Sequence, residues 1–172
     1  SDVPEYMSAQ IELTKMDLET GEAVSQGNAG FAGTQFTIKY YSGYYEKDSL
    51  PPEPAKTWVL ETKEMADPDG GPARYRALLD ERHKISGDDF YVSDGNVVLP
   101  LGTVTIEETK APVGYLLEGA YLQADGNGEK IDGLYISQIR ESGHEISLAG
   151  GSKYAIYDQI IRGGVKIRKR DF

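Results

Sequence analysis

Three ionisable residues, Lys15, Glu108 and Asp158, fall on the apolar faces of predicted strands. Side chains alternate between the two faces of a strand, so Lys15 shares its face with Ile11 and Leu13. Glu108 continues the apolar face of the sequence Val-Thr-Ile-Glu-Glu, and Asp158 lies between the two isoleucines of Ile-Tyr-Asp-Gln-Ile. The pattern therefore predicts one lysine and two carboxyl groups that point into a core.

These residue types can react with one another once they are removed from water. Burial lowers the pKa of a lysine and raises that of a carboxyl group, so it favours a neutral amine beside a neutral acid. A neutral Lys15 amine is a nucleophile for the carboxyl carbon of Asp158, with Glu108 transferring protons and polarising the carbonyl. The product is an amide between two side chains, formed with loss of one water molecule. The fold would supply the proximity that this condensation needs.

Two other interpretations of the same residues stay open on the strand pattern alone. Lys15 can lie in a buried ion-pair network with Glu108 and Asp158 without reacting, because an unpaired buried ammonium costs on the order of several kcal/mol. Any of the three residues can instead lie at a sheet edge in contact with water.

The sequence around Glu108 adds information that the strand pattern lacks. Residues 99–115 read Leu-Pro-Leu-Gly-Thr-Val-Thr-Ile-Glu-Glu-Thr-Lys-Ala-Pro-Val-Gly-Tyr. This segment closely resembles the Glu-Thr-Lys-Ala-Pro-x-Gly-Tyr signature of Cna-B-type (SpaA-like, prealbumin-like) domains in Gram-positive surface adhesins and pilins. Residues 13–21 look like the first strand of that family, and residues 31–38 are similar to its second strand.

The resemblance implies a role for each of the three residues. In that family the first-strand lysine is joined to an asparagine or aspartate of the last strand, and the glutamate of the Glu-Thr motif promotes the reaction. Carried over by position, Lys15 and Asp158 form an isopeptide crosslink and Glu108 is the catalytic residue. Aspartate stands where asparagine is commoner, which changes the leaving group from ammonia to water.

Short β-rich segments separated by glycine-containing turns predict an all-β chain, and their spacing suits a β-sandwich. The resemblance implies a Cna-B/transthyretin-like Greek-key β-sandwich, with enlarged insertions at residues 42–96 and 118–153. The expected strands cover residues 11–15, 35–41, 57–62, 74–79, 89–92, 96–99, 103–108, 133–139 and 153–161.

A repeated strand pattern predicts the domain organisation. The sequence Ile11–Leu18 returns as Val165–Phe172, with Lys-x-Asp at the same positions. We therefore expect an N-terminal lead-in at 1–10 and a Cna-B-like domain at 11–162. Residues 163–172 are expected to be a linker and the truncated first strand of a following repeat.

The composition limits the possible partners. A chain of 172 residues with 39% hydrophobic residues can bury one core, and a formal charge of -10 disfavours nucleic acid and anionic membranes. Cysteine is absent, so disulfides and thiolate metal sites are excluded. His83 and His144 lack metal-ligand spacing. We expect a monomer with no metal, no cofactor and no membrane contact by this fragment.

The crosslink and the resemblance together imply a structural stalk or spacer domain of a bacterial cell-surface adhesin or pilin. Such a domain is extracellular and is anchored to the cell wall through its parent protein, with neighbouring tandem domains as partners. It is no enzyme, because self-crosslinking occurs once. An alternative is an adhesive module that binds a host matrix protein or glycan through its insertions, and a third is a carbohydrate-processing or carbohydrate-binding accessory domain. No ligand-binding residue is identified, and the tyrosine-rich segment 40–45 is interpreted as the end of a strand.

Overall fold

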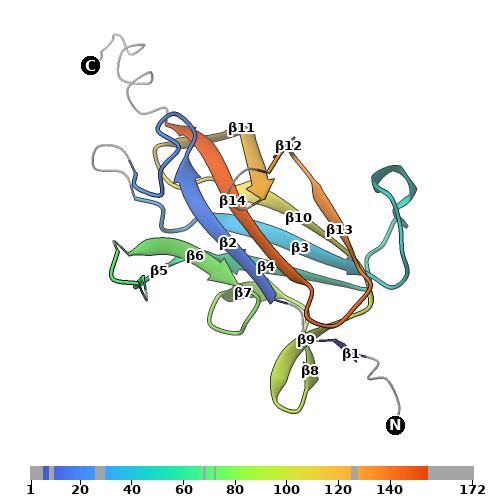
Figure 1. Cartoon of the computed structure of the whole chain (residues 1–172). Coiled ribbons are helices and arrows are strands. Elements are labelled where there is room, and N and C mark those ends of the chain that lie inside the picture. Colours follow the sequence, from blue (N-terminus) through green and yellow to red (C-terminus); the bar gives the residue numbers. More distant parts are fainter. Residues whose placement is uncertain are drawn as a thin grey trace.

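Almost every element of the computed structural model is a β-strand (Figure 1). The structure describes residues 6–7, 10–25, 30–67, 69–71, 73–124 and 128–154. The strands in these residues are β1 (Tyr6–Met7), β2 (Gln10–Asp17), β3 (Gln35–Tyr41), β4 (Lys56–Glu61), β5 (Lys63–Met65), β6 (Arg74–Leu78), β7 (Lys84–Gly87), β8 (Tyr91–Ser93), β9 (Asn96–Pro100), β10 (Gly102–Lys110), β11 (Tyr115–Ala124), β12 (Lys130–Asp132), β13 (Tyr135–Ile139) and β14 (Glu145–Tyr154). A single 3-10 turn, η1 (Lys47–Ser49), accompanies them in the described residues. The predicted all-β class is confirmed.

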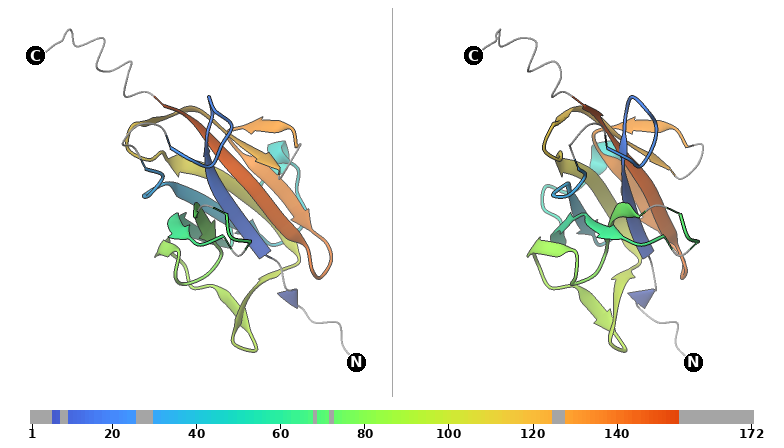
Figure 2. Two further views of the ribbon diagram at one scale, coloured as in Figure 1. Left: turned by 60° about the vertical axis from the view of Figure 1, so that its left-hand side comes forward. Right: turned by 90° about the vertical axis from the view of Figure 1, so that its left-hand side faces the viewer.

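Two large sheets pack against each other as a β-sandwich (Figure 2). One sheet has the strand order β13-β10-β3-β4-β7, and the other has the order β12-β11-β14-β2-β6-β5. A three-stranded ribbon, β1-β9-β8, extends from one end of the sandwich. None of the helical structure in the described part of the chain is long and apolar enough to span a membrane.

One hydrophobic core fills the space between the two large sheets. It includes Trp58, which is fully buried. Alternating residues of β2, β3, β4, β10 and β14 supply most of its apolar side chains, as expected for strands with one face covered. These include Ile11, Leu13, Phe36, Ile38, Leu60, Val104, Ile106, Ile146 and Leu148.

Strand β14 lies beside β2 and runs parallel to it, near the centre of the six-stranded sheet (Figure 1). The register places Gly150 opposite Lys15 and Ser152 opposite Asp17. Parallel neighbouring strands cannot be joined by a tight hairpin. Most strands of the sandwich lie between β2 and β14 in the sequence. The first long strand and the last described strand are thereby brought into direct contact.

The position of β14 differs from the sequence prediction, which places the last strand at residues 153–161. The structure has a strand at Glu145–Tyr154, and residues 155–161 lie outside the described residues. Glycine is depleted in strands, so the sequence Ala-Gly-Gly-Ser in this segment masked its β-character. The inward positions of the strand are nevertheless all buried, and they are Ile146, Leu148, Gly150 and Ser152.

The glycine pair of β14 is needed because side chains approach the strand closely on both faces. A Cβ atom added to Gly150 would lie 3.0 Å from Glu108 Oε1 and 3.0 Å from the Phe36 ring. A Cβ atom on Gly151 would lie 2.7 Å from Tyr121 Cζ. The two glycines therefore let β14 fit between the core and the ring of Tyr121.

The tyrosine-rich segment lies at the end of β3, as the sequence predicts. Tyr40 and Tyr41 are buried in the strand, and the loop that follows is attached to β10. The Thr103 hydroxyl donates to the Gly43 carbonyl at 2.8 Å, and the Tyr45 amide donates to Thr103 Oγ1 at 3.0 Å. The start of the 42–96 insertion thus packs on the sandwich.

We predict that Gly150→Ala destabilises the fold by about 1–3 kcal/mol, because the added methyl group overpacks the contact with Glu108 and Phe36. Gly30→Ala is the matched control, since a Cβ atom there meets no atom within 4 Å, and we expect a change within about 0.5 kcal/mol. Urea denaturation of both variants measures the difference. Equal midpoints for the two variants would contradict the close approach at Gly150.

Candidate crosslinking site

Lys15 lies fully buried between the two sheets. Ile11, Leu13 and Lys15 point inward from β2, and the exposed fraction of Lys15 is 0%. Glu108 points inward from β10 on the opposite sheet, on the same face as Val104 and Ile106, as the alternation along the strand predicts. Its side chain is 2% exposed. The sequence prediction for the direction of both residues is confirmed.

The Lys15 ammonium donates hydrogen bonds to three oxygen atoms. Its Nζ lies 2.6 Å from Ser152 Oγ, 3.0 Å from the Gly150 carbonyl and 3.2 Å from the Met16 carbonyl. Two of these acceptors belong to β14. The Lys15 amine on β2 is therefore hydrogen-bonded to the neighbouring parallel strand, β14.

Glu108 interacts with Lys15 both directly and through Ser152. Lys15 Nζ lies 3.6 Å from Glu108 Oε1, which is an ion pair but too long for a hydrogen bond. The Ser152 hydroxyl donates to Glu108 Oε2 at 2.8 Å. Glu108 Oε1 itself has no hydrogen-bond partner among the described residues. Ser152 therefore bridges the amine and the acid.

Two aromatic rings complete the surroundings of the ammonium. Lys15 Nζ is 5.8 Å from the centre of the Phe31 ring and 5.9 Å from that of Tyr115. The two ring centres are 5.4 Å apart. Aromatic faces attract cations at such distances, so these rings replace part of the lost hydration.

Asp17 connects the end of β2 to the ring of Tyr115. The Tyr115 hydroxyl donates to Asp17 Oδ2 at 2.5 Å, and Asp17 is fully buried. The amides of Glu19 and Thr20 donate to Asp17 Oδ1 at 2.7 and 2.9 Å, which closes the turn after the strand. One hydrogen bond thus joins Asp17 of the Lys-x-Asp motif to Tyr115 of the Gly-Tyr motif.

Burial shifts the proton affinities of the amine and the acid toward each other. It lowers the pKa of Lys15 to about 8, while the charges of Glu108 and Asp17 oppose the shift. It raises the pKa of Glu108, opposed by the Lys15 charge and the hydrogen bond from Ser152. Both shifts favour the neutral forms, so a proton can move from the ammonium to the carboxylate at a smaller free-energy cost than in water.

The predicted crosslinking partner, Asp158, lies outside the described residues, and its pairing with Lys15 stays a prediction. On β14 the residues that contact the amine are Gly150 and Ser152. The predicted domain boundaries also remain predictions. In the segment expected to be a lead-in, Tyr6–Met7 pairs with β9 and β2 begins at Gln10.

Sequence reasoning missed three side chains of this site. Asp17 and Tyr115 were visible only as parts of the Lys-x-Asp repeat and the Gly-Tyr motif, and alternation does place Asp17 on the same face as Lys15. Ser152 gave no signal, because a serine after two glycines is typical of a turn. Its role depends on the register between β14 and β2.

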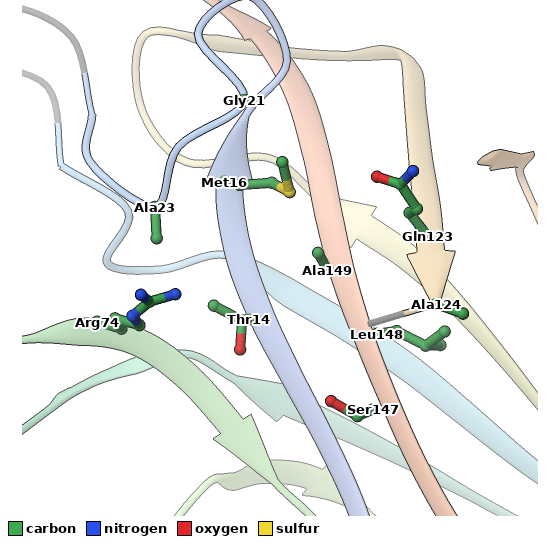
Figure 3. A pocket seen from close by; sticks show the side chains of 10 residues that line it. All are labelled: Thr14, Met16, Gly21, Ala23, Arg74, Gln123, Ala124, Ser147, Leu148 and Ala149. Carbon is green, nitrogen blue, oxygen red and sulfur yellow. The ribbon is translucent and has the colours of Figure 1, made fainter. Parts of the chain in front are cut away.

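Other parts of the described chain give little chemistry. A hollow of about 200 Å³ lies on the outer face of the six-stranded sheet, where Thr14, Ser147 and Ala149 form its floor and Arg74 lies at one side (Figure 3). Thr14 alternates with Lys15 along β2, so this hollow is on the face opposite the buried amine. Across the residues that the structure describes, no group of three or more His, Cys, Asp or Glu side chains could hold a metal ion.

Comparison with known proteins gives similarity to solved structures only. No protein-family model and no curated protein matches the chain. A solved structure of the Bacillus anthracis TIE protein is similar at 20% sequence identity and a TM-score of 0.34, over 85% of this chain and 17% of that one. The chain thus spans about a sixth of the length of that structure.

We predict that Tyr115→Phe destabilises the fold by about 1–3 kcal/mol, because it removes a donor from the buried carboxylate of Asp17. Tyr44→Phe is the control, since Tyr44 is 40% exposed, and it should change stability by less than about 0.5 kcal/mol. Thermal and urea unfolding measure both effects. If the two variants are equally stable, the Tyr115 hydroxyl does not support the site.

Proposed function

We propose that this chain is a structural stalk or spacer domain of a Gram-positive cell-surface adhesin or pilin, of the Cna-B type that its sequence motifs resemble. The observation that carries the proposal is the fully buried Lys15, paired with Glu108 and located on a strand that runs parallel to β14. A lysine in this position is expensive to bury, and apolar residues in place of a buried ion pair are often equally or more stabilising. A domain that joins its terminal strands through that lysine gains a covalent connection between its two ends.

The arrangement of β2 and β14 suits a domain that is pulled from its two ends. The strands are parallel over eight paired residues, so β2 begins at the end of the sandwich opposite to the end where β14 stops. Tension that enters at Gln10 and leaves at Tyr154 therefore acts along both strands in opposite directions. All the hydrogen bonds between them share the load instead of breaking one after another.

The covalent form of this connection is the amide between Lys15 and Asp158. The neutral amine attacks the Asp158 carboxyl carbon, a C–N bond forms, a C–O bond breaks, and one water molecule leaves. Glu108 takes a proton from the amine and returns it to the departing oxygen. The step occurs once per chain. A link that closes a loop of this size stabilises the fold by about 5 kcal/mol in the loop-entropy model.

The place of action follows from the same proposal. A stalk domain lies outside the cell, is attached to the wall through its parent protein, and transmits tension to neighbouring tandem domains of the same chain. The absence of cysteine fits this setting, because an amide crosslink provides what disulfides provide in other exported proteins.

We predict that the intact chain, measured by mass spectrometry under denaturing conditions, is lighter than its sequence by one water molecule. Lys15→Arg and Asp158→Ala should both restore the full mass, because each removes one of the two reacting groups. Glu108→Gln should leave the protein folded but at full mass, since the amide cannot exchange protons as the acid does.

Lys153→Arg is the matched control for this measurement, because Lys153 is exposed on β14. It should keep the loss of water. A wild-type chain of full mass would contradict the crosslink, and loss of water that persists in Asp158→Ala would assign the bond to another carboxyl group.

We also predict that force direction decides the mechanical strength of the unlinked fold. In the Lys15→Arg chain, pulling through the two termini should need a higher force than pulling through Gly21→Cys and the C-terminus, because the second pair loads β2 and β14 from the same end. Single-molecule force spectroscopy measures both geometries. Equal forces, or a weaker response to terminal pulling, would contradict a stalk role.

A further inference from the structure

The Ser152 hydroxyl lies between Lys15 and Glu108 and is hydrogen-bonded to both. It accepts from Lys15 Nζ at 2.6 Å and donates to Glu108 Oε2 at 2.8 Å. Both bonds point in the same direction, from the amine toward the acid. The direct approach of Nζ to Oε1 is 3.6 Å, which is too long for proton transfer within a hydrogen bond.

The other acceptors described for Lys15 cannot take this role. The Gly150 and Met16 acceptors are backbone carbonyl oxygens, which carry no proton to pass on. A serine hydroxyl is both donor and acceptor, so it can receive one proton while it releases another. Among the three described acceptors, Ser152 therefore provides the route for a proton.

The backbone holds the Ser152 hydroxyl in place. Ser152 is fully buried, and its carbonyl accepts a hydrogen bond from the Leu18 amide at 2.8 Å. It is paired with Asp17 in the β14–β2 register, two residues beyond Gly150, whose lack of a side chain makes room for Glu108. The hydroxyl is thus fixed between the two groups before any reaction begins.

We propose that Ser152 is a catalytic residue of the Lys15 condensation, and that its hydroxyl relays a proton from the Lys15 ammonium to the Glu108 carboxylate. The inference rests on the function proposed above and adds a residue to it. An N–H bond of Lys15 breaks as an O–H bond forms on Ser152, while the original Ser152 proton moves to Glu108 Oε2. The products are a neutral amine and a neutral acid, and Ser152 is unchanged.

The relay predicts a specific dependence of the reaction on pH. The titratable groups described around Lys15 are Glu108 on β10, Asp17 on β2 and Tyr115 on β11. With the relay, the amine loses its proton to Glu108 inside the protein, so the rate should vary little near neutral pH. Without it, the amine must lose its proton to solvent. The rate should then rise about tenfold per pH unit below the pKa of Lys15.

The first experiment follows the loss of water by intact mass in chain freshly made by cell-free translation, at a series of pH values. Ser152→Ala should slow the reaction at least about tenfold at pH 7 and make it pH-dependent, whereas Ser152→Thr should retain the wild-type rate and profile because it keeps the hydroxyl. Ser147→Ala, on the outer face of β14, is the matched control and should behave as wild type. A wild-type rate and profile in Ser152→Ala would overturn the relay.

If Ser152→Ala does not fold, Ser152→Val replaces it, since valine matches the shape of the Ser152→Thr side chain but has no hydroxyl proton. The same slowing and the same pH dependence are then expected. A Ser152→Val chain that reacts as fast as wild type at every pH would overturn the relay in the same way.

A second experiment separates the relay from the crosslink itself. In the Asp158→Ala chain, which cannot form the proposed bond, NMR follows the titration of Lys15 Nζ and of the Glu108 carboxyl carbon. The hydrogen bond from Ser152 lowers the pKa of Glu108, so that pKa should rise in Asp158→Ala/Ser152→Ala, while the direct charge interaction between Lys15 and Glu108 remains. Unchanged titrations would overturn the relay. Changed titrations beside a wild-type chain of full mass would keep the relay and reject the crosslink.

Discussion

The burial of one lysine ammonium is the constraint on which the rest of this structure depends. Removing such a charge from water costs several kcal/mol even after relaxation, so the fold must return comparable interactions at the same place. Lys15 receives them from an acid on the opposite sheet, from a hydroxyl and a carbonyl on the parallel strand, and from two aromatic rings. These partners come from distant parts of the chain, so the amine is satisfied only when the sandwich is assembled.

That requirement explains features of the fold that would otherwise look like defects. A glycine pair in the middle of β14 weakens the strand, yet Gly150 is what allows Glu108 to lie against it and share a proton network with Lys15. A buried aspartate at the end of β2 is likewise unfavourable alone. The cost of burying Asp17 is offset by hydrogen bonds from the Tyr115 hydroxyl and two backbone amides. Asp17 in turn holds the Tyr115 ring near the ammonium.

The same interactions underlie both the packing at the centre of the sandwich and the reactivity proposed for it. Desolvation brings the proton affinities of Lys15 and Glu108 closer together, which is unfavourable for an ion pair but favourable for forming a nucleophilic amine. The fixed hydroxyl of Ser152 gives the proton a path between them. A site that lay at the surface would keep its lysine charged and unreactive, so burial is the source of the proposed chemistry.

The sequence by itself determined the all-β class and the direction of Lys15 and Glu108, because a period of two assigns every residue of a strand to one face. It also marked the segment around Glu108 through its motif. Only the tertiary structure decided that β14 begins at Glu145, that it runs parallel to β2, and that Ser152 is the residue beside the amine. Alternation is a local property of one strand. The register between two strands that are more than a hundred residues apart depends on how the whole core packs, and no local pattern records it.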